Sequence, residues 1–121
     1  MDRIVEFLQR YPYASVDLAA RLVHLQLQAS KGASKVRNFF VKFQDRILYA
    51  TDLTRLTLRP DDDFANDARA TWLVDWRFLT TDAPMQSTEF SGAVYGLALP
   101  REVVDKIYQE NARRVLPGGW R

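Results

Sequence analysis

The chain has 121 residues, a common size for one domain, and 47% of them are hydrophobic. It contains no cysteine, which excludes disulfides and thiolate zinc sites. Its 17 basic residues nearly balance its 15 acidic ones and are scattered along the sequence, so we expect no nucleic-acid partner. No apolar run approaches the roughly 20 residues of a membrane span, and no apolar signal segment follows Met1. These features predict one cytoplasmic domain over residues 1–121 that does not contact membranes.

The first quarter of the chain predicts a helix, a strand and a second helix. Residues 2–11 place their apolar side chains on one side of a helix, which Pro12 ends. The segment from Tyr13 to Asp17 alternates like a short strand and ends in an acid. Residues 18–29 then return to helical spacing.

The next segment predicts a break, a strongly apolar helix and a second strand. The sequence at residues 31–33 interrupts the helical pattern, and Ser34 is a suitable N-cap for the helix that follows. Ile47 to Ala50 reads as a short buried strand that stops at Thr51 and Asp52. This alternation of helices and strands is typical of an α/β fold with parallel strands.

The second half of the chain predicts helices and loops. In order, these are a polar connection, a helix, an irregular loop, a short apolar segment and a final helix (residues 53–63, 64–79, 80–92, 93–99 and 100–115). No internal repeat or low-complexity linker divides the chain, so the single-domain prediction stands.

Two predicted strands end in an acid, and the chain has one histidine. The carboxyl ends of parallel strands carry the reactive groups of many α/β proteins, where Asp17 and Asp52 could bind a metal or act as a base. The alternative is that such an aspartate accepts backbone N–H bonds and caps a turn. His24 is the only available imidazole, either as a ligand or base or as a structural histidine in an apolar stretch.

Four segments of the chain, taken together, resemble a known family. In order and spacing they are similar to the carboxyl-terminal part of the amidohydrolase superfamily, and more closely to its amidohydrolase-2 branch of metal-dependent TIM-barrel hydrolases and decarboxylases. The segments are YPYASVDLAARL, FFVKFQDRILYATDL, WRFLTTD and YGLALPREVVDKIYQENARRVLPG.

The resemblance implies a place for each segment in the barrel. Residues 14–17 would match the seventh strand and residues 47–51 the eighth. Asp52 would match the acid that closes the eighth strand, which in this family binds the catalytic metal and takes a proton from the attacking water. The final helix would match the last barrel helix, with Tyr108 and Asn111 as packing and hydrogen-bonding residues.

The chain lacks the other metal ligands of the amidohydrolase family. A full barrel has eight strands in about 250 residues, and the family's other histidine ligands have no counterparts here. A catalytic zinc needs about three protein ligands and an open position for water. A metal centre would therefore combine Asp17, His24 and Asp52, with Asp82 and Glu89 as further candidates, or would draw ligands from several chains.

Parallel strands with unpaired edges and helices with one-sided apolar faces favour self-association. We therefore expect a homo-oligomer, a dimer or tetramer, that completes a partial (βα) barrel and brings copies of Asp52 and His24 together. The leading hypothesis is a minimal hydrolase that uses a divalent metal, preferably zinc, to activate water, with Asp52 and His24 as ligands or bases. Small activated esters, lactones or phosphoesters would be its substrates. The alternative is a non-catalytic fragment that folds by self-association.

Overall fold

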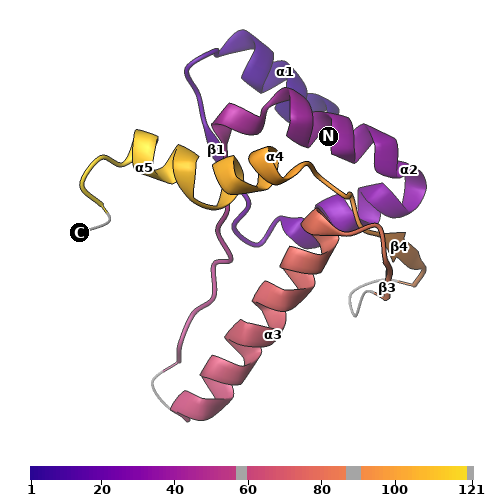
Figure 1. Cartoon of the computed structure of the whole chain (residues 1–121), viewed down its shortest axis with the longest axis vertical. Helices are drawn as coiled ribbons and strands as arrows, with labels where there is room; N and C mark the ends of the chain where they lie inside the picture. Colours follow the sequence, from indigo (N-terminus) through magenta and orange to yellow (C-terminus); the bar gives the residue numbers. More distant parts are fainter. Residues whose placement is uncertain (57–59, 87–90, 120–121) are drawn as a thin grey trace.

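The computed structural model describes residues 1–56, 60–86 and 91–119 and shows a mixed α/β fold in which helices dominate (Figure 1). The helical elements are α1 (Asp2–Arg10), α2 (Leu22–Lys42), the 3-10 turn η1 (Gln44–Arg46), α3 (Asp61–Thr80), α4 (Arg101–Asp105), the π-helical turn η2 (Lys106–Glu110) and α5 (Asn111–Val115). The strands are β1 (Val16–Asp17), β2 (Ile47–Leu48), β3 (Pro84–Gln86) and β4 (Ala93–Tyr95). The α/β prediction is confirmed at this level, and the strands within the described ranges do not close into a barrel.

The two predicted strands pair in parallel, although both are shorter than predicted. Val16 lies opposite Ile47, and the N–H of Leu18 continues the ladder by donating to the carbonyl of Leu48 at 3.0 Å. Tyr13, predicted to begin the first strand, is 98% exposed and outside it. The fully buried side chain of Ile47 packs in the core and anchors β2 there.

The irregular loop predicted over residues 80–92 contains a strand. There β3 pairs antiparallel with β4, with Met85 opposite Val94. Sequence reasoning missed β3 because Pro84 and the polar residues around it resemble loop composition. Residues 87–90, including the candidate ligand Glu89, lie outside the described ranges.

The predicted break near residue 32 appears as a kink within α2. Gly32 has non-helical backbone angles, so the two predicted helices are joined into one long element that bends. The buried face of α2 includes Val36, Phe39 and Phe40, as the helical spacing predicts. No helix in the described ranges is long and apolar enough to cross a membrane.

The apolar core gathers around α2, β2, β4 and the C-terminal helical segment. Its fully buried large side chains are Phe40, Phe78, Leu8, Ile47, Leu79, Ile107, Val36, Val94 and Val103. By contrast, the N-terminal half of α3 stands away from this body as an arm (Figure 1). Three of the four buried residues of α3 lie near its C-terminal end, so only that end is anchored in the core.

The outer edge of β2 is covered by the C-terminal helical segment. The buried Asn111 side chain donates through Nδ2 to the carbonyls of Ile47 at 2.8 Å and Gln44 at 2.6 Å. The N–H of Tyr49 donates to the carbonyl of Ile107, in the π-helical turn, at 2.9 Å. The expectation that both edges of the strand pair are unpaired is therefore wrong for β2, because a side chain and a helix carbonyl occupy the positions of a neighbouring strand. In the described ranges β1 pairs with no strand other than β2.

Replacement of Asn111 tests the importance of this covered edge. We expect Asn111→Ala to lower the free energy of unfolding by about 2 kcal/mol or more, because it leaves two carbonyls near the core without their donor. Urea denaturation measures the loss. Asn38→Ala, at an exposed position of α2, is the matched control and should change stability little. Equal stability of the two variants would contradict a structural role for Asn111.

Candidate functional site

A hollow of about 440 Å³ lies beyond the carboxyl ends of β1 and β2. Leu18 and Ala20 follow β1, Ala50 and Thr51 follow β2, and all four residues line it. The remaining lining residues come mainly from the start of α2 and the middle of α3: Arg21, Leu22, Val23, Gln26, Ala70, Thr71, Val74, Asp75 and Gln86. Ligands of open α/β sheets bind at this end of the strands, so the hollow is the candidate functional site.

The backbone is strained in both loops that leave the strand pair. Ala20 has φ of 49° and Asp52 has φ of 59°, which are left-handed conformations in residues other than glycine. Such a conformation costs about 1–2 kcal/mol and is enriched at functional loops. Two of the three non-glycine residues with positive φ in the described ranges thus lie at the end of the strand pair where the hollow opens, and the third, Ala98, lies shortly before α4.

Asp52 is exposed and directly follows Thr51 at the edge of this hollow. Among the described residues no hydrogen bond or ion pair engages its carboxylate. The nearby turn is instead closed by Thr51, whose Oγ1 accepts the N–H of Leu53 at 3.4 Å. The predicted cap role of Asp52 is thus not seen in this part of the chain, and its carboxylate points to solvent.

Asp17 and His24 line a second hollow, of about 580 Å³, between α1, β1 and α2. Both side chains are exposed, so His24 is not the buried structural histidine considered from the sequence. The Oδ1 atom of Asp17 accepts the N–H of Ala19 at 2.9 Å, which is a turn-capping bond. Asp52 is not among the residues that line this hollow. The fold thus places Asp17 and His24 in the wall of one hollow, and Asp52 is not among the residues that line it.

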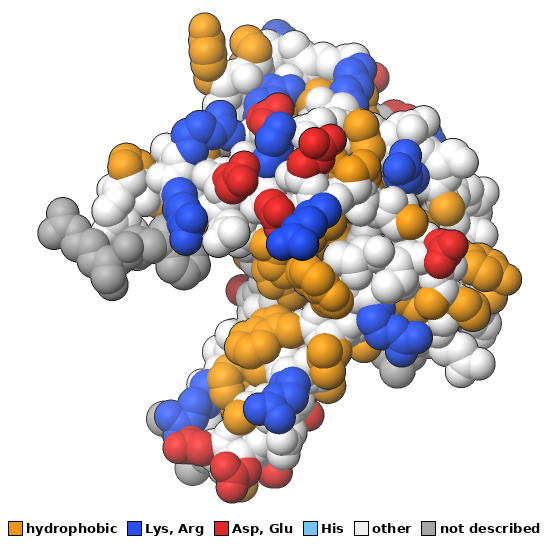
Figure 2. All heavy atoms as spheres, viewed as in Figure 1, with side chains coloured by type: hydrophobic (Ala, Val, Ile, Leu, Met, Phe, Trp, Pro, Cys, Tyr) orange, Lys and Arg blue, Asp and Glu red, His pale blue; other side chains and the backbone are white. Residues whose placement is uncertain are grey.

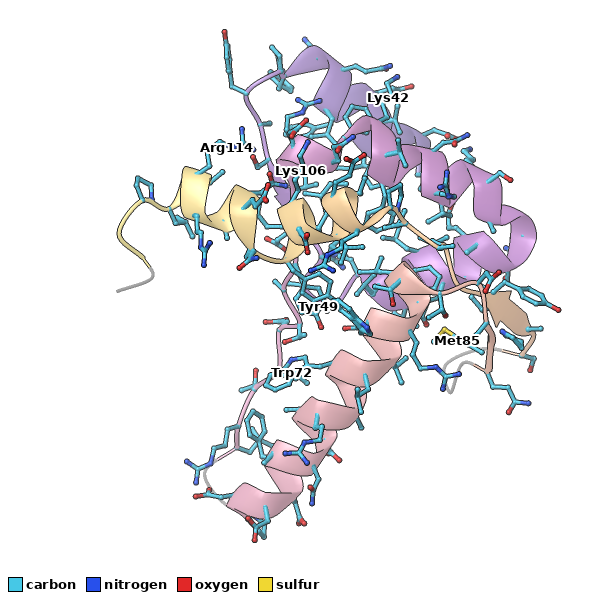
Figure 3. All side chains as sticks on the ribbon, in the orientation of Figure 1. Lys42, Tyr49, Trp72, Met85, Lys106 and Arg114 are labelled. Carbon is cyan, nitrogen blue, oxygen red and sulfur yellow. The ribbon has the colours of Figure 1, made fainter. Side chains whose placement is uncertain are left out.

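The first hollow contains an acid that sequence reasoning missed. Asp75 is 7% exposed, and its Oδ2 accepts a hydrogen bond of 2.8 Å from the hydroxyl of Tyr49. Tyr49 stacks on Tyr108 with ring centroids 4.3 Å apart, and Trp76 contacts Tyr108 edge-on. In Figure 3, Tyr49 lies below the C-terminal helical segment, near the anchored end of α3. The signal in the sequence was an aspartate in register with Ala68 and Phe78 on the buried face of α3.

This aromatic and acidic cluster has shifted proton affinities. Burial raises the pKa of the Asp75 carboxyl above its ordinary value, and the hydrogen bond from Tyr49 acts in the opposite direction. Burial also raises the pKa of the hydroxyls of Tyr49 and Tyr108, so both stay protonated at neutral pH. The buried Tyr108 hydroxyl makes no hydrogen bond within the described part of the chain. Asp75 can therefore keep its proton at pH values at which an ordinary carboxyl group has lost it. This property suits a general acid or base.

The described residues do not supply the ligands of a zinc site in one chain. Within residues 1–56, 60–86 and 91–119, no three His, Asp or Glu side chains come together as a group that could hold a metal. Asp52 is absent from the hollow that Asp17 and His24 line. A zinc centre built on Asp52 would need ligands beyond this set.

The shifted pKa of Asp75 predicts a pH dependence of stability. Because the folded chain holds this proton more tightly than the unfolded chain, the free energy of unfolding should fall as pH rises from 3.8 through the raised pKa. The slope should reach at most about 1.4 kcal/mol per pH unit. Asp75→Asn should remove this fall, as urea denaturation across that pH range would measure.

The matched control for this prediction is Asn66→Ala, which changes an exposed neutral residue of the same helix. It should leave the pH slope of wild type unaltered. If the free energies of unfolding of wild type and Asp75→Asn change with pH in the same way, the pKa of Asp75 is not raised in the folded chain.

Comparison with known proteins leaves the resemblance to amidohydrolases as a hypothesis. No family model, curated protein or solved structure matches the chain.

Proposed function

We propose that this chain forms the end of an amidohydrolase-like partial barrel and acts as a metal-dependent hydrolase. In this proposal β1 and β2 are the last two barrel strands, and the helical segment from α4 to α5 is the closing helix. The parallel register of the two strands and the seal of Asn111 on β2 support this placement. The resemblance that runs through the four sequence segments supports it independently.

The observation that carries the proposal is the position of Asp52. Asp52 lies four residues beyond the end of β2, in a left-handed backbone conformation, and its carboxylate has no partner among the described residues. An ionised acid in this position is suited to accept a proton from a water molecule that attacks a substrate. The adjacent hollow is large enough for a small molecule and is mostly apolar, with Asp75 and Arg21 as charged groups in its wall.

We further propose that the centre is completed by self-association. Zinc is the metal that the resemblance implies, and it would supply Lewis acidity when bound. The residues described in one chain do not meet its need for about three ligands. A dimer or tetramer could add Asp17 and His24 of a second chain, which share one exposed surface. Activated esters, lactones and phosphoesters are the proposed substrates, because their good leaving groups lower the barrier that such a centre must overcome.

A non-catalytic, self-associating barrel fragment is the second candidate. It is favoured by the turn-capping bond of Asp17, which engages one of the three proposed ligands structurally. It is also favoured by the exposed tryptophans of α3, which suit an interface.

Hydrolysis and zinc content of purified variants test the proposal. With 4-nitrophenyl acetate and bis(4-nitrophenyl) phosphate as substrates, Asp52→Asn should lower kcat/KM by about 100-fold or more. Asparagine tolerates the left-handed backbone at this position, so the loss would report on the charge and not on strain. His24→Ala should reduce both activity and the zinc retained after dialysis.

Asp62→Asn is the matched control, because it removes an exposed acid at the start of α3. It should retain the activity of wild type. Absence of activity in wild type, or activity that survives Asp52→Asn, His24→Ala and chelation, would overturn the hydrolase proposal in favour of the non-catalytic fragment.

A further inference from the structure

Two buried polar side chains in the wall of the first hollow have unused hydrogen-bonding groups. Gln26 is 8% exposed and lines the hollow, and its side-chain amide makes no hydrogen bond to a described residue. Asp75 uses Oδ2 for the bond from Tyr49, and its Oδ1 has no partner in the described part of the chain. Among the described residues only the Tyr108 hydroxyl is both sealed from solvent and unpartnered, so the free atoms of Gln26 and Asp75 still reach solvent. Because buried polar groups are nearly always paired, a ligand in the hollow would supply the partners that both side chains lack.

The start of α2 gives the same hollow a positively polarised wall. Arg21, Leu22 and Val23 line it, and the N–H groups of Leu22 and Val23 donate to no described residue. The first turn of α2 contains no acidic residue, and no side-chain hydrogen bond caps it. The Arg21 side chain is exposed and has no hydrogen bond or ion pair with a described residue. Free N–H groups at a helix N-terminus, beside a guanidinium group, favour a carboxylate.

Most of the remaining wall is apolar. Its aliphatic side chains include those of Leu18, Ala50, Ala70 and Val74. Figure 2 shows hydrophobic side chains gathered where the arm of α3 joins the body, and this part of α3 borders the hollow. A ligand that fills the hollow therefore needs an apolar part as well as polar groups.

The two kinds of polar wall together favour a zwitterion. An ammonium group could donate to Oδ1 of Asp75 and to the side-chain carbonyl of Gln26, which would offset the cost of burying the carboxylate. A carboxylate on the same molecule could accept from the start of α2 and from Arg21. A simple amine would leave the donors of α2 unused, and a simple carboxylate would leave Asp75 without a partner of opposite charge.

We propose that the hollow beyond β1 and β2 binds a small apolar amino acid. Its carboxylate lies at the start of α2 beside Arg21, and its ammonium group bonds to Asp75 and Gln26. The apolar side chain of the amino acid packs against the aliphatic part of the wall. This binding site goes beyond the proposed hydrolysis, because it uses none of the three proposed metal ligands.

Isothermal titration calorimetry of the full chain with L-leucine, L-valine and L-phenylalanine tests the site. At least one of them should bind saturably, and loss of its ammonium group or of its carboxylate should weaken binding by about tenfold or more. For leucine these two probes are 4-methylpentanoate and 3-methylbutylamine, and the matching acid and amine serve for each of the others. Binding of none of the amino acids, or equal binding of the acid or the amine, would overturn the proposal.

Variants of the wall assign the binding to this hollow. Arg21→Gln and Asp75→Asn should each weaken binding by about tenfold, and Gln26→Leu, which removes a neutral hydrogen-bonding group, by about fivefold. Arg113→Gln is the matched control, because Arg113 is an exposed arginine of α5 outside the hollow, and it should bind as wild type does. Circular dichroism would verify that each variant is folded. Equal affinities of Arg21→Gln and Arg113→Gln, or of Gln26→Leu and wild type, would overturn the site.

The fate of this site can be separated from that of the hydrolase proposal. Binding of an amino acid by a chain without hydrolytic activity would support the site and refute the hydrolase proposal alone. Hydrolysis by a chain that binds none of the amino acids would refute the amino-acid site alone.

Discussion

The hydrogen bonds that seal the outer edge of β2 are the constraint on which the rest of the structure depends. A two-residue strand has little stability of its own, because few ladder bonds offset the cost of ordering the chain. Here the side chain of Asn111 and the carbonyl of Ile107 provide the missing bonds on the side away from β1. The segment from α4 to α5 thus fixes β2 in the core and determines where its carboxyl end emerges.

The same seal connects the strand end to the arm. Tyr49 donates its backbone N–H to the C-terminal helical segment and its hydroxyl to Asp75 of α3. One residue therefore links β2, the C-terminal helical segment and the anchored end of the arm. The hollow lies next to this junction, lined mainly by the residues after β1 and β2, the start of α2 and the middle of α3, and the loop at Asp52 lies at its edge. The proposed hydrolytic centre depends on this junction.

The sequence predicted the features that depend on local pattern. Asp17 was found at the end of β1 because an apolar run stops there, whereas Asp52 lies four residues beyond the end of β2. The kink of α2 was found because Gly32 interrupts helical spacing. The structure agrees with the hydrogen-bonding role that the family resemblance implied for Asn111. Asp75 was missed because it sits among apolar residues of α3, and its meaning emerges only when Tyr49, 26 residues away, is seen to contact it.

Other features could not be read from local pattern because they arise from long-range packing. The covered edge of β2 joins residues 64 positions apart, and no short-range periodicity reports such a contact. The strand β3 was missed because its polar, proline-containing sequence acquires strand structure only through pairing with β4.

Anomalous diffraction from crystals grown with zinc would test the central claim most directly. We expect a zinc ion at about 2.0–2.2 Å from a carboxylate oxygen of Asp52, with further ligands contributed by a second copy of the chain. An oligomer that binds no zinc at Asp52, or a zinc ion held only at another surface, would contradict it.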